Sequence, residues 1–466
     1  MIQINMFKKE IYIERRKVLA ETVTSGLILL LGNEESPMNY LDNTYHFRQD
    51  STFLYYFGLD QPSLAGVIDT DSGEVTVFGD DLTIDMIVWM GSLPKLSVLC
   101  EKVGVIHQKP LSELQETIQE TVSRGRKIHF LPPYRMDNRL KLRNLLNVDF
   151  DNAGQKASLE LVKRVVFQRE IKSDEEIAEI DKAVEISAEM HLAAMKMARP
   201  GMRESEVAAR VAEVALAHNG QMAFPIIATI NGQTLHNHYH GNIIKSGDLF
   251  LLDAGAETEM HYAGDLSSTF PVDPFFTSRQ KEVYQIALDA HQAAVDMLNP
   301  GMPFKEVHFT ACRMIFDGLK LLGLTKGDTD EAVKEGAHAL FFPCGTGHMM
   351  GFDAHDMEDL GEQWVGYDGE PKSAMFGLKS LRLAKPLRPG YVVTIEPGIY
   401  FIPELIDLWK AEKKHTSFLN YDAIEKYRDF SGLRNEEDFV ITEDGARRLG
   451  KGLPLIIEAV EKMRQQ

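Results

Sequence analysis

The sequence predicts two domains, an α/β domain over residues 1–155 and a larger α+β domain over residues 165–466 that contains two similar halves. Three observations predict this arrangement. A chain of 466 residues is too long for one ordinary core. Its first third holds short β-rich runs between helical stretches, and its remainder repeats a pattern of helix, Pro-Gly turn and helix.

The first domain is predicted from its alternation of strand-like and helical segments. Residues 111–123 read as a helix, whereas β-rich runs that we expect to be strands cover residues 27–31, 52–57, 65–69, 75–78 and 127–131. No cluster of ligand-type side chains occurs in this part of the sequence. We therefore expect a scaffold that covers the cleft of the second domain and supports oligomers.

The boundary is expected between Asp151 and Ser173, where a polar loop precedes a new helix. Ser173 and Glu176 form a capping-box pattern, which predicts a helix start directly after Ser173. A second capping-box pattern, with Thr277 and Gln280, opens another predicted helix.

The repeat follows these two helices. Arg-Pro-Gly-Met at 199–202 returns as Asn-Pro-Gly-Met at 299–302, and Glu-Val follows in both copies, at 206–207 and 306–307. Two such copies imply a pseudo-twofold domain in which each helical pair backs half of a curved antiparallel sheet. We expect the functional site where the two halves meet.

The composition restricts the partners and the compartment. A formal net charge of −19 disfavours nucleic acid and anionic membranes. The N-terminus lacks the uninterrupted apolar core of a secretory signal, and no apolar run is long enough to span a bilayer. The three cysteines, Cys100, Cys312 and Cys344, provide no disulfide framework, so we expect a cytoplasmic protein.

Two aspartates stand at the ends of apolar runs near the middle of the chain. Asp253 ends the run Phe250–Leu252, and Asp265 opens the next one. If these segments pair as antiparallel neighbours, both carboxylates can point to one face, where a cation would have to balance them. The alternative is a hairpin with two solvated aspartates.

Further ligand-type residues occur downstream in similar settings. Glu396 ends the run Val392–Ile395, Glu436 precedes another run, and His348 follows a glycine-rich turn. Four carboxylates and one imidazole make an oxygen-rich site without thiolates. Such a set suits two divalent ions such as Mn²⁺, Co²⁺ or Zn²⁺.

These residues occur in an order that resembles a known family. The motifs are His236, Asp253-Ala-Gly, Ala-Gly-Asp265, Gly-His348, Asp353-Ala-His355-Asp, Glu396-Pro-Gly and Arg434-Asn-Glu436. In this order they resemble the dinuclear-metal "pita-bread" peptidases, and within them the proline-specific branch of Xaa-Pro aminopeptidase (aminopeptidase P) and prolidase. The resemblance implies a creatinase/aminopeptidase-like pita-bread fold for residues 165–466 and an aminopeptidase P-like N-terminal domain.

The resemblance also implies five metal ligands for two divalent ions, with Mn²⁺ expected first. Asp265 and Glu436 would bridge both ions, Asp253 would complete one site, and His348 and Glu396 would complete the other.

Further roles follow from the same resemblance. His236 and His355 would steady the substrate carbonyl and transfer a proton to the leaving proline nitrogen. Glu396 would also act as the base for water, and Arg434 would order the carboxylates around the ions.

Three other interpretations remain open for this part of the sequence. His236, His238 and His240 form an H-x-H-x-H run, which on a strand could bind a metal by itself. Otherwise His238 and His240 are pocket or surface residues. The Cys-Gly-Thr-Gly run at 344–347 could be taken for a phosphate loop, but no Lys-Ser/Thr follows it. Cys344 is expected to line the cleft, since no general base is paired with it.

One spacing departs from the family pattern. Asp265 follows Asp253 by 12 residues (265 − 253), one more than is usual in relatives. An insertion within a strand would turn one aspartate off the shared face, whereas an insertion in the turn would not. We expect the extra residue in the turn, between Glu257 and His261.

The resemblance leaves two activities open. The motif wording favours an Xaa-Pro aminopeptidase that acts on peptides with proline in second position, as a homodimer or larger assembly. Residues 400–430 resemble an insertion of prolidases, and Arg382 matches an arginine that pairs with a dipeptide carboxylate there, which favours a dipeptidase. A metal-free binding protein and a creatinase-like amidinohydrolase are minor alternatives, disfavoured because all five ligand positions are present.

Overall fold

The computed structural model describes residues 5–466, and the chain divides into two compact units. The first unit runs to Arg169 and includes the later segment Met357–Trp364. The second unit comprises Glu170–Asp356 and Val365–Gln466. A short helix, α13 (Glu362–Val365), lies at the end of the returning segment.

A five-stranded mixed sheet forms the centre of the first unit, in the order β6-β5-β4-β1-β7. The inner strand β1 pairs antiparallel with the central strand β4 and parallel with the edge strand β7. The strands of this unit are β1 (Leu27–Leu31), β2 (Pro37–Tyr40), β3 (Asn43–Thr44), β4 (Ala65–Asp69), β5 (Val75–Phe78), β6 (His107–Lys109) and β7 (Ile128–Phe130).

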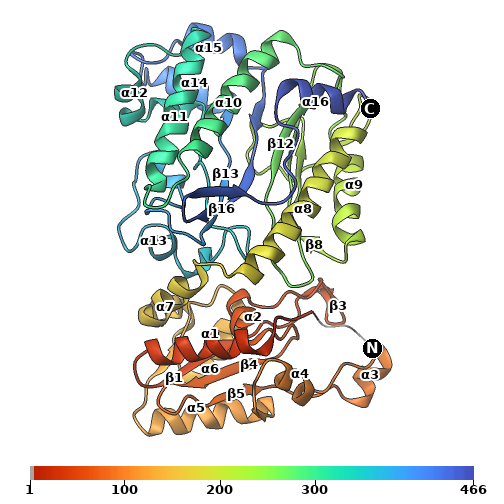
Figure 1. The fold of residues 1–466 in the computed structure, drawn as a ribbon, viewed down its shortest axis with the longest axis vertical. Coiled ribbons are helices and arrows are strands. Elements are labelled where there is room, and N and C mark those ends of the chain that lie inside the picture. Colours follow the sequence, from red (N-terminus) through yellow and green to blue (C-terminus); the bar gives the residue numbers. More distant parts are fainter. Residues whose placement is uncertain (1–4) are drawn as a thin grey trace. The chain divides into compact units, whose positions relative to one another are not determined.

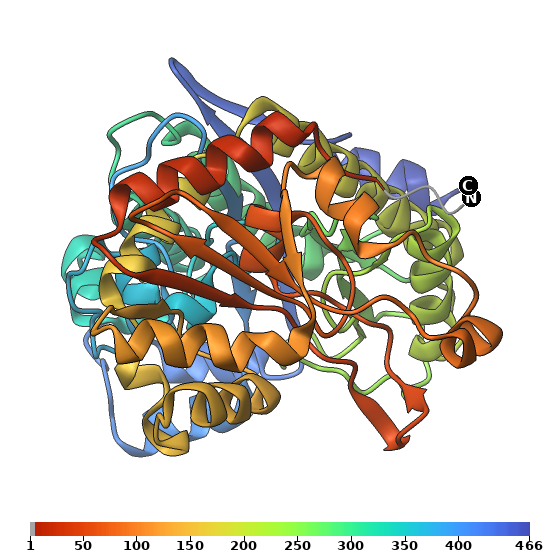
Figure 2. The same ribbon diagram turned by 90° about the horizontal axis from the view of Figure 1, so that it is seen from below.

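Helices cover both faces of this sheet, and Figure 2 shows α1 on one side and α5 on the other. Leu27 and Leu29 of β1 pack with Leu114 and Ile118 of α5 in one buried cluster. The helices are α1 (Lys9–Thr22), α2 (Ser51–Phe57), α3 (Ile84–Met90), α4 (Leu96–Lys102), α5 (Leu114–Ser123), α6 (Met136–Leu146) and α7 (Leu159–Arg169).

The predicted strand at residues 52–57 is wrong, because this segment is the helix α2. The Asp50 side chain accepts a hydrogen bond from the Phe53 amide at 2.8 Å and caps the N-terminus. Gly58, with φ of 61°, ends the helix. All seven residues of α2 are buried, so the apolar residues show no helical period that the sequence could reveal.

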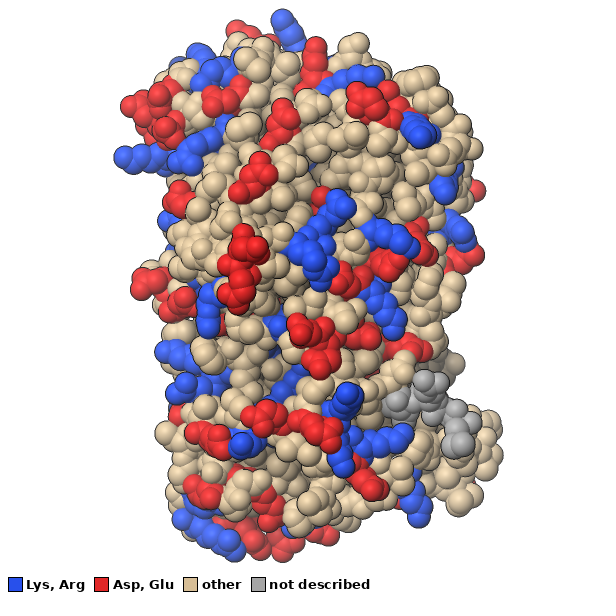
Figure 3. Space-filling model, in the orientation of Figure 1, with Lys and Arg blue, Asp and Glu red and all other residues tan. Residues whose placement is uncertain are grey.

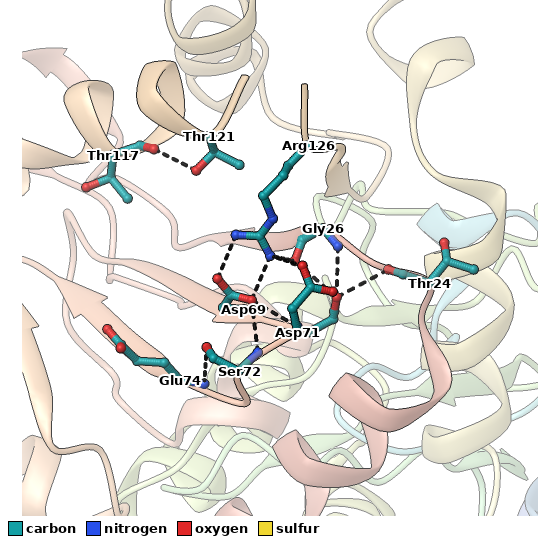
Figure 4. A network of polar contacts seen from close by, with 10 residues as sticks. Thr24, Gly26, Asp69, Asp71, Ser72, Glu74, Thr117, Thr121 and Arg126 are labelled. Atoms are coloured by element: carbon teal, nitrogen blue, oxygen red, sulfur yellow. Dashed lines mark hydrogen bonds and ion pairs between the residues drawn. The ribbon is translucent and has the colours of Figure 1, made fainter. Parts of the chain in front are cut away.

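An arginine fixes the turn between β4 and β5 of the first unit (Figure 4). Arg126 donates to both carboxylate oxygens of Asp69 at 2.8 and 2.7 Å and to Asp71 at 2.6 Å. It also donates to the Gly26 carbonyl at 3.2 Å, just before β1. These hydrogen bonds lower the pKa of Asp69 and join three segments at one end of the sheet.

The second unit contains strands from two halves of the chain, backed by two helical pairs (Figure 1). The helices are α8 (Asp174–Met197), α9 (Glu204–Ala217), α10 (Ser278–Asp296), α11 (Phe304–Leu321), α12 (Thr329–Glu335), α14 (Pro403–Ala411), α15 (Tyr421–Ile424) and α16 (Ile457–Arg464). The strands are β8 (Gln221–Met222), β9 (Ile227–Thr229), β10 (Leu249–Asp253), β11 (Ala256–Glu257), β12 (Ser267–Pro271), β13 (Val392–Ile395), β14 (Gly398–Tyr400), β15 (Gly432–Arg434), β16 (Glu437–Thr442) and β17 (Gly445–Arg448).

Both predicted capping boxes are present. Ser173 caps α8 together with Glu176, and Thr277 caps α10 together with Gln280. α8 packs against α9 and the strands of the first half, while α10 packs against α11 and the strands of the second half.

The repeat predicted from the Pro-Gly turns is present in the structure, and corresponding glycines of the two copies make corresponding hydrogen bonds. The Gly201 amide donates to Ile244 at 2.9 Å, and the Gly301 amide donates to Leu387 at 2.8 Å. The strands that follow these two hydrogen bonds also correspond. Asp253 ends β10, and Glu396 directly follows β13, at an offset of 143 residues (396 − 253). The two halves thus each place a carboxylate at the same point of the sheet.

The charged side chains are interspersed over the face shown in Figure 3, where basic and acidic groups alternate. Among the helices of residues 5–466, none combines the length and the apolar character that a membrane crossing needs.

Candidate metal centre

The register of β10 and β12 places the two aspartates on one face. Asp253 pairs with Ser267, and the same register continues to the bridge between Glu257 and Ala263. Asp265 therefore lies opposite Gly255, and side chains two residues apart on paired strands point the same way. Residues 258–262 form the turn beyond this bridge, and the register is continuous from Asp253 to the bridge.

The second hairpin repeats this geometry with glutamates. Ile395 pairs with Glu437, and Gly398 pairs with Arg434 in an unbroken antiparallel register. Glu396 therefore lies opposite Glu436 on one face of the ribbon. Arg434 lies two residues before Glu436, so its side chain points to the same face.

Two isolated β-bridges connect the two hairpins to each other and connect the segment of His348 to the second hairpin. Ser267 pairs with Glu436, which connects β12 to the second half. Met349 pairs with Val393, and the Thr394 amide donates to the His348 carbonyl at 3.1 Å. The register thus directs all five predicted ligands, Asp253, Asp265, His348, Glu396 and Glu436, to one face of the curved sheet.

The distances agree with this register. His348 Nε2 lies 3.6 Å from Asp265 Oδ2 and 3.5 Å from Glu396 Oε1. One ligand atom each of Asp265, His348 and Glu436 lies within 4.8 Å of the others. His348 Nδ1 lies 3.1 Å from the Met349 carbonyl, which fixes the ring so that Nε2 faces the carboxylates.

The electrostatics of the cluster favour bound cations. Burial raises the pKa of Asp265 and of Glu436 well above the usual range, and the charges of neighbouring carboxylates, including Asp253, raise both further. Burial also raises the pKa of Glu396. Burial holds the pKa of His348 well below its usual value, so its imidazole is neutral and can act as a ligand.

Arg434 is the buried cation that contacts this face. It forms an ion pair with Asp253, and it donates to Ser267 Oγ at 2.9 Å and to the Tyr400 hydroxyl at 2.9 Å. Ser267 Oγ in turn donates to Glu436 at 2.7 Å. One guanidinium cannot neutralise four carboxylates, and an oxygen-rich set with one neutral imidazole fits divalent cations.

The other predicted site residues lie near this cluster. The His355 ring packs at 4.4 Å from the His348 ring, centroid to centroid. His236 is exposed on a loop, and partial burial together with the positive charge of Arg434 lowers its pKa. Arg382 is half-buried, and its charge lowers the pKa of both His236 and His348.

Several partners of the cluster were not expected from the sequence. Besides Ser267 and Tyr400, Asp438 accepts a hydrogen bond from the Asp265 amide at 3.1 Å. His191 of α8 contacts the Ala254 carbonyl at 3.0 Å and Ser268 Oγ at 2.7 Å. Only the position of Asp438, two residues beyond Glu436 on the same face, could have indicated such a role.

The alternative interpretations of the sequence are not supported. His236, His238 and His240 lie outside the strands, and His240 Nε2 contacts the Ile226 carbonyl at 3.1 Å. Residues 344–347 lead into an extended segment that pairs with β13 and not into the helix of a phosphate loop. Burial raises the pKa of the Cys344 thiol to about 12, which disfavours a thiolate nucleophile.

Two family models match the chain. Residues 178–443 match "Metallopeptidase family M24", and residues 12–129 match "Aminopeptidase P, N-terminal domain". The chain is 31% identical to the Xaa-Pro dipeptidase of Homo sapiens over 96% of its own length and 90% of that protein. It is 30% identical to the Xaa-Pro aminopeptidase of Escherichia coli over 96% of both chains.

Solved structures resemble the whole chain. The aminopeptidase P of Pseudomonas aeruginosa matches with a TM-score of 0.82 at 27% identity and covers 99% of both chains. An Escherichia coli aminopeptidase P variant in complex with substrate matches with a TM-score of 0.82 at 28% identity, again over 99% of both chains. These likenesses confirm the predicted fold class, an α/β domain followed by a pita-bread domain.

Proposed function

The chain belongs to metallopeptidase family M24, and on this premise we propose that it is a metal-dependent Xaa-Pro aminopeptidase. It would hydrolyse the bond between an N-terminal residue and a following proline. The observation that carries the proposal is the convergence of four carboxylates and one neutral imidazole on one face of the sheet, beside two further histidines.

Two divalent ions per chain are proposed, held by Asp253, Asp265, His348, Glu396 and Glu436. When bound, such ions supply Lewis acidity and make a water molecule nucleophilic near neutral pH. Mn²⁺ is proposed first because the ligand set is mainly hard oxygen, with Co²⁺ and Zn²⁺ as alternatives.

The proton steps are assigned to groups that substrate can reach. The Glu396 side chain is 19% exposed, against 7% for Asp265, so Glu396 is the carboxylate best placed to take a proton from attacking water. The nitrogen of an Xaa-Pro bond is tertiary and needs a proton before it leaves. His236 is exposed and has a lowered pKa, and we assign it and His355 to the substrate carbonyl and to this proton.

Arg434 is assigned a positioning role. Its three contacts are an ion pair with Asp253 and hydrogen bonds to Ser267 and Tyr400. A guanidinium with this fixed geometry holds the Asp253 carboxylate in place and, through Ser267, the Glu436 carboxylate.

A second candidate is an Xaa-Pro dipeptidase. The residues between β14 and β15 form α14 and α15, an elaboration of the hairpin that carries Glu396 and Glu436. Arg382 lies near His236, where it could pair with the free carboxylate of a dipeptide. The likeness to a human Xaa-Pro dipeptidase supports this candidate equally with the aminopeptidase.

Substrate length separates the two candidates. Turnover of matched Xaa-Pro and Xaa-Pro-Yaa peptides should be compared with the purified, metal-loaded protein. We expect hydrolysis of both, with release of the N-terminal residue from the longer peptide. Turnover confined to the dipeptide would replace the aminopeptidase with the dipeptidase, and turnover of neither would contradict both.

The Arg382→Met variant refines this comparison. Loss of a charge-assisted hydrogen bond costs about 1.5–3 kcal/mol, or roughly 10- to 150-fold in kcat/KM. If Arg382 pairs with a dipeptide carboxylate, Arg382→Met lowers turnover of the dipeptide by this factor and turnover of a longer peptide by much less. Equal losses of turnover on the dipeptide and the longer peptide would mean that Arg382 does not pair with the dipeptide carboxylate and acts on the carboxylate cluster instead.

A reducing, cytoplasmic setting is proposed because Cys100, Cys312 and Cys344 are all free thiols. A homodimer or larger assembly is proposed from family resemblance alone. Neither proposal affects the chemistry assigned to the cluster.

A further inference from the structure

A second group of metal-type side chains lies apart from the carboxylate cluster. His308 and Cys312 lie one turn apart on α11, and His338 lies in the 3₁₀ turn Ala337–Leu340 that packs against α11. One ligand atom of each lies within 4.8 Å of the other two. All three side chains are buried, with at most 1% exposure.

Hydrogen bonds orient His308 toward this group. His308 Nδ1 lies 2.9 Å from Thr346 Oγ1, and His308 Nε2 lies 3.5 Å from Cys312 Sγ. A metal-ligating histidine commonly has an oxygen beside its second ring nitrogen, and Thr346 Oγ1 is such an oxygen for His308. Its Nε2 is therefore directed to the space shared with Cys312.

His338 provides an independent observation. Both of its ring nitrogens are buried, and neither makes a hydrogen bond of normal geometry, although the Val333 backbone is close enough to raise its pKa slightly against the larger effect of burial. A core histidine that served packing alone would normally satisfy its N–H, because an unsatisfied buried donor costs about 1–3 kcal/mol. A ligand that binds one nitrogen of His338 would remove part of this penalty.

We propose that His308, Cys312 and His338 form a third metal site, which binds a cation of the Zn²⁺ class. Two imidazoles and one thiolate are the donors that zinc prefers, and no carboxylate belongs to the group. His308 Nε2 and Cys312 Sγ lie 3.5 Å apart. A nitrogen and a sulfur that bind one tetrahedral zinc ion, at about 2.0–2.1 and 2.3 Å from it, have a similar separation.

The ionisation states of the donors are compatible with uptake. Burial lowers the pKa of His308 to about 3 and that of His338 to about 4, so both imidazoles are neutral donors near pH 7. Burial raises the pKa of the Cys312 thiol, so this residue enters the reaction protonated. Binding breaks the S–H bond, forms a sulfur–metal bond and releases one proton to solvent for each ion.

The site has a structural connection to the proposed catalytic cluster. The Thr346 side chain contacts His308, and the Thr346 carbonyl accepts the Glu396 amide at 2.7 Å. A cation that fixes His308 would therefore fix the segment that positions Glu396. The side chains act through Thr346, so they are positioning residues and not catalytic ones.

Cobalt distinguishes this site from the carboxylate cluster, because only a thiolate ligand gives sulfur-to-cobalt charge-transfer absorption in the near ultraviolet. Metal-free protein should be titrated with Co²⁺ beside the Cys312→Ser and Cys344→Ser variants. We expect one equivalent of charge-transfer absorption in the unsubstituted protein and in Cys344→Ser, and none in Cys312→Ser. Absence of the band in the unsubstituted protein, or its persistence in Cys312→Ser, overturns the proposal.

A second measurement needs no variant. The protein should be loaded with Mn²⁺ at the carboxylate cluster and then with one equivalent of Zn²⁺, and the zinc should be examined by X-ray absorption. We expect one sulfur neighbour at about 2.3 Å and nitrogen neighbours at about 2.0–2.1 Å. A zinc shell without sulfur, even when Zn²⁺ is supplied in excess of what the carboxylate cluster can hold, would overturn the proposal. Neither readout depends on peptidase activity, so the third site can fail while the proposed function stands.

Discussion

Replacement of His348 by alanine is expected to lower hydrolysis of an Xaa-Pro peptide by at least about 10³-fold, with the fold retained. His348 supplies the one imidazole among the five proposed ligands, and its Nε2 lies 3.5 Å from Glu396 and 3.6 Å from Asp265. Without it, one of the two proposed ions would lose a ligand, and the two carboxylates would lose a neutral neighbour. Circular dichroism and kcat/KM with an Xaa-Pro-Yaa peptide measure the two parts of this prediction.

The His218→Ala variant is the matched control. His218 is an exposed histidine after α9, and its ring lies 3.0 Å from the Val214 carbonyl. Its replacement should change kcat/KM by less than about threefold, because its other contact is an exposed pair with Glu189 at 3.4 Å and such pairs contribute little. If His348→Ala kept a tenth or more of the original turnover, His348 would not be a ligand that catalysis needs.

Replacement of Arg434 by methionine is expected to destabilise the metal-free protein by about 3–5 kcal/mol and to abolish turnover. Methionine keeps much of the volume but removes the buried positive charge that contacts Asp253, Ser267 and Tyr400. Asp253 would then be buried beside other carboxylates without its cation. Urea unfolding of chelated protein measures the stability, and peptide hydrolysis measures the activity.

Two further variants show whether the charge or the geometry of Arg434 matters. Arg434→Lys keeps the charge but cannot reproduce three directed hydrogen bonds, so we expect partial recovery of stability and little recovery of turnover. Arg447→Met removes an exposed pair with Asp181 at 2.7 Å and should cost less than about 1 kcal/mol. An Arg434→Met protein as stable as Arg447→Met would mean that the carboxylates do not need this cation.

The residues of the candidate centre could be predicted because each carboxylate stands at the end of an apolar strand. Asp253 ends β10 and Glu396 follows β13, and the registers place Asp265 on the same face as Asp253 and Glu436 opposite Glu396. The repeat was predictable for a related reason, since Gly201 and Gly301, with φ of 95° and 83°, mark turns that few other residues can form. Strong local signals therefore predicted the repeat of the second unit and the residues that converge in the candidate centre.

Other features had no such signal. The buried helix α2 is apolar on every side, so it resembles a strand in sequence. Ser267, Tyr400 and Asp438 contact the cluster through hydrogen bonds between distant segments, and such pairs leave no pattern along one strand. The group of His308, Cys312 and His338 depends on a tertiary contact between α11 and a short turn, which spacing alone does not reveal.

The central claim is that five side chains from both halves of the second unit hold two divalent ions. Anomalous diffraction from crystals of active, Mn²⁺-loaded protein tests it most directly. The account predicts two manganese peaks about 3.5–4 Å apart, surrounded by Asp253, Asp265, His348, Glu396 and Glu436. A single peak, or manganese bound away from these residues in protein that still hydrolyses Xaa-Pro peptides, would contradict it.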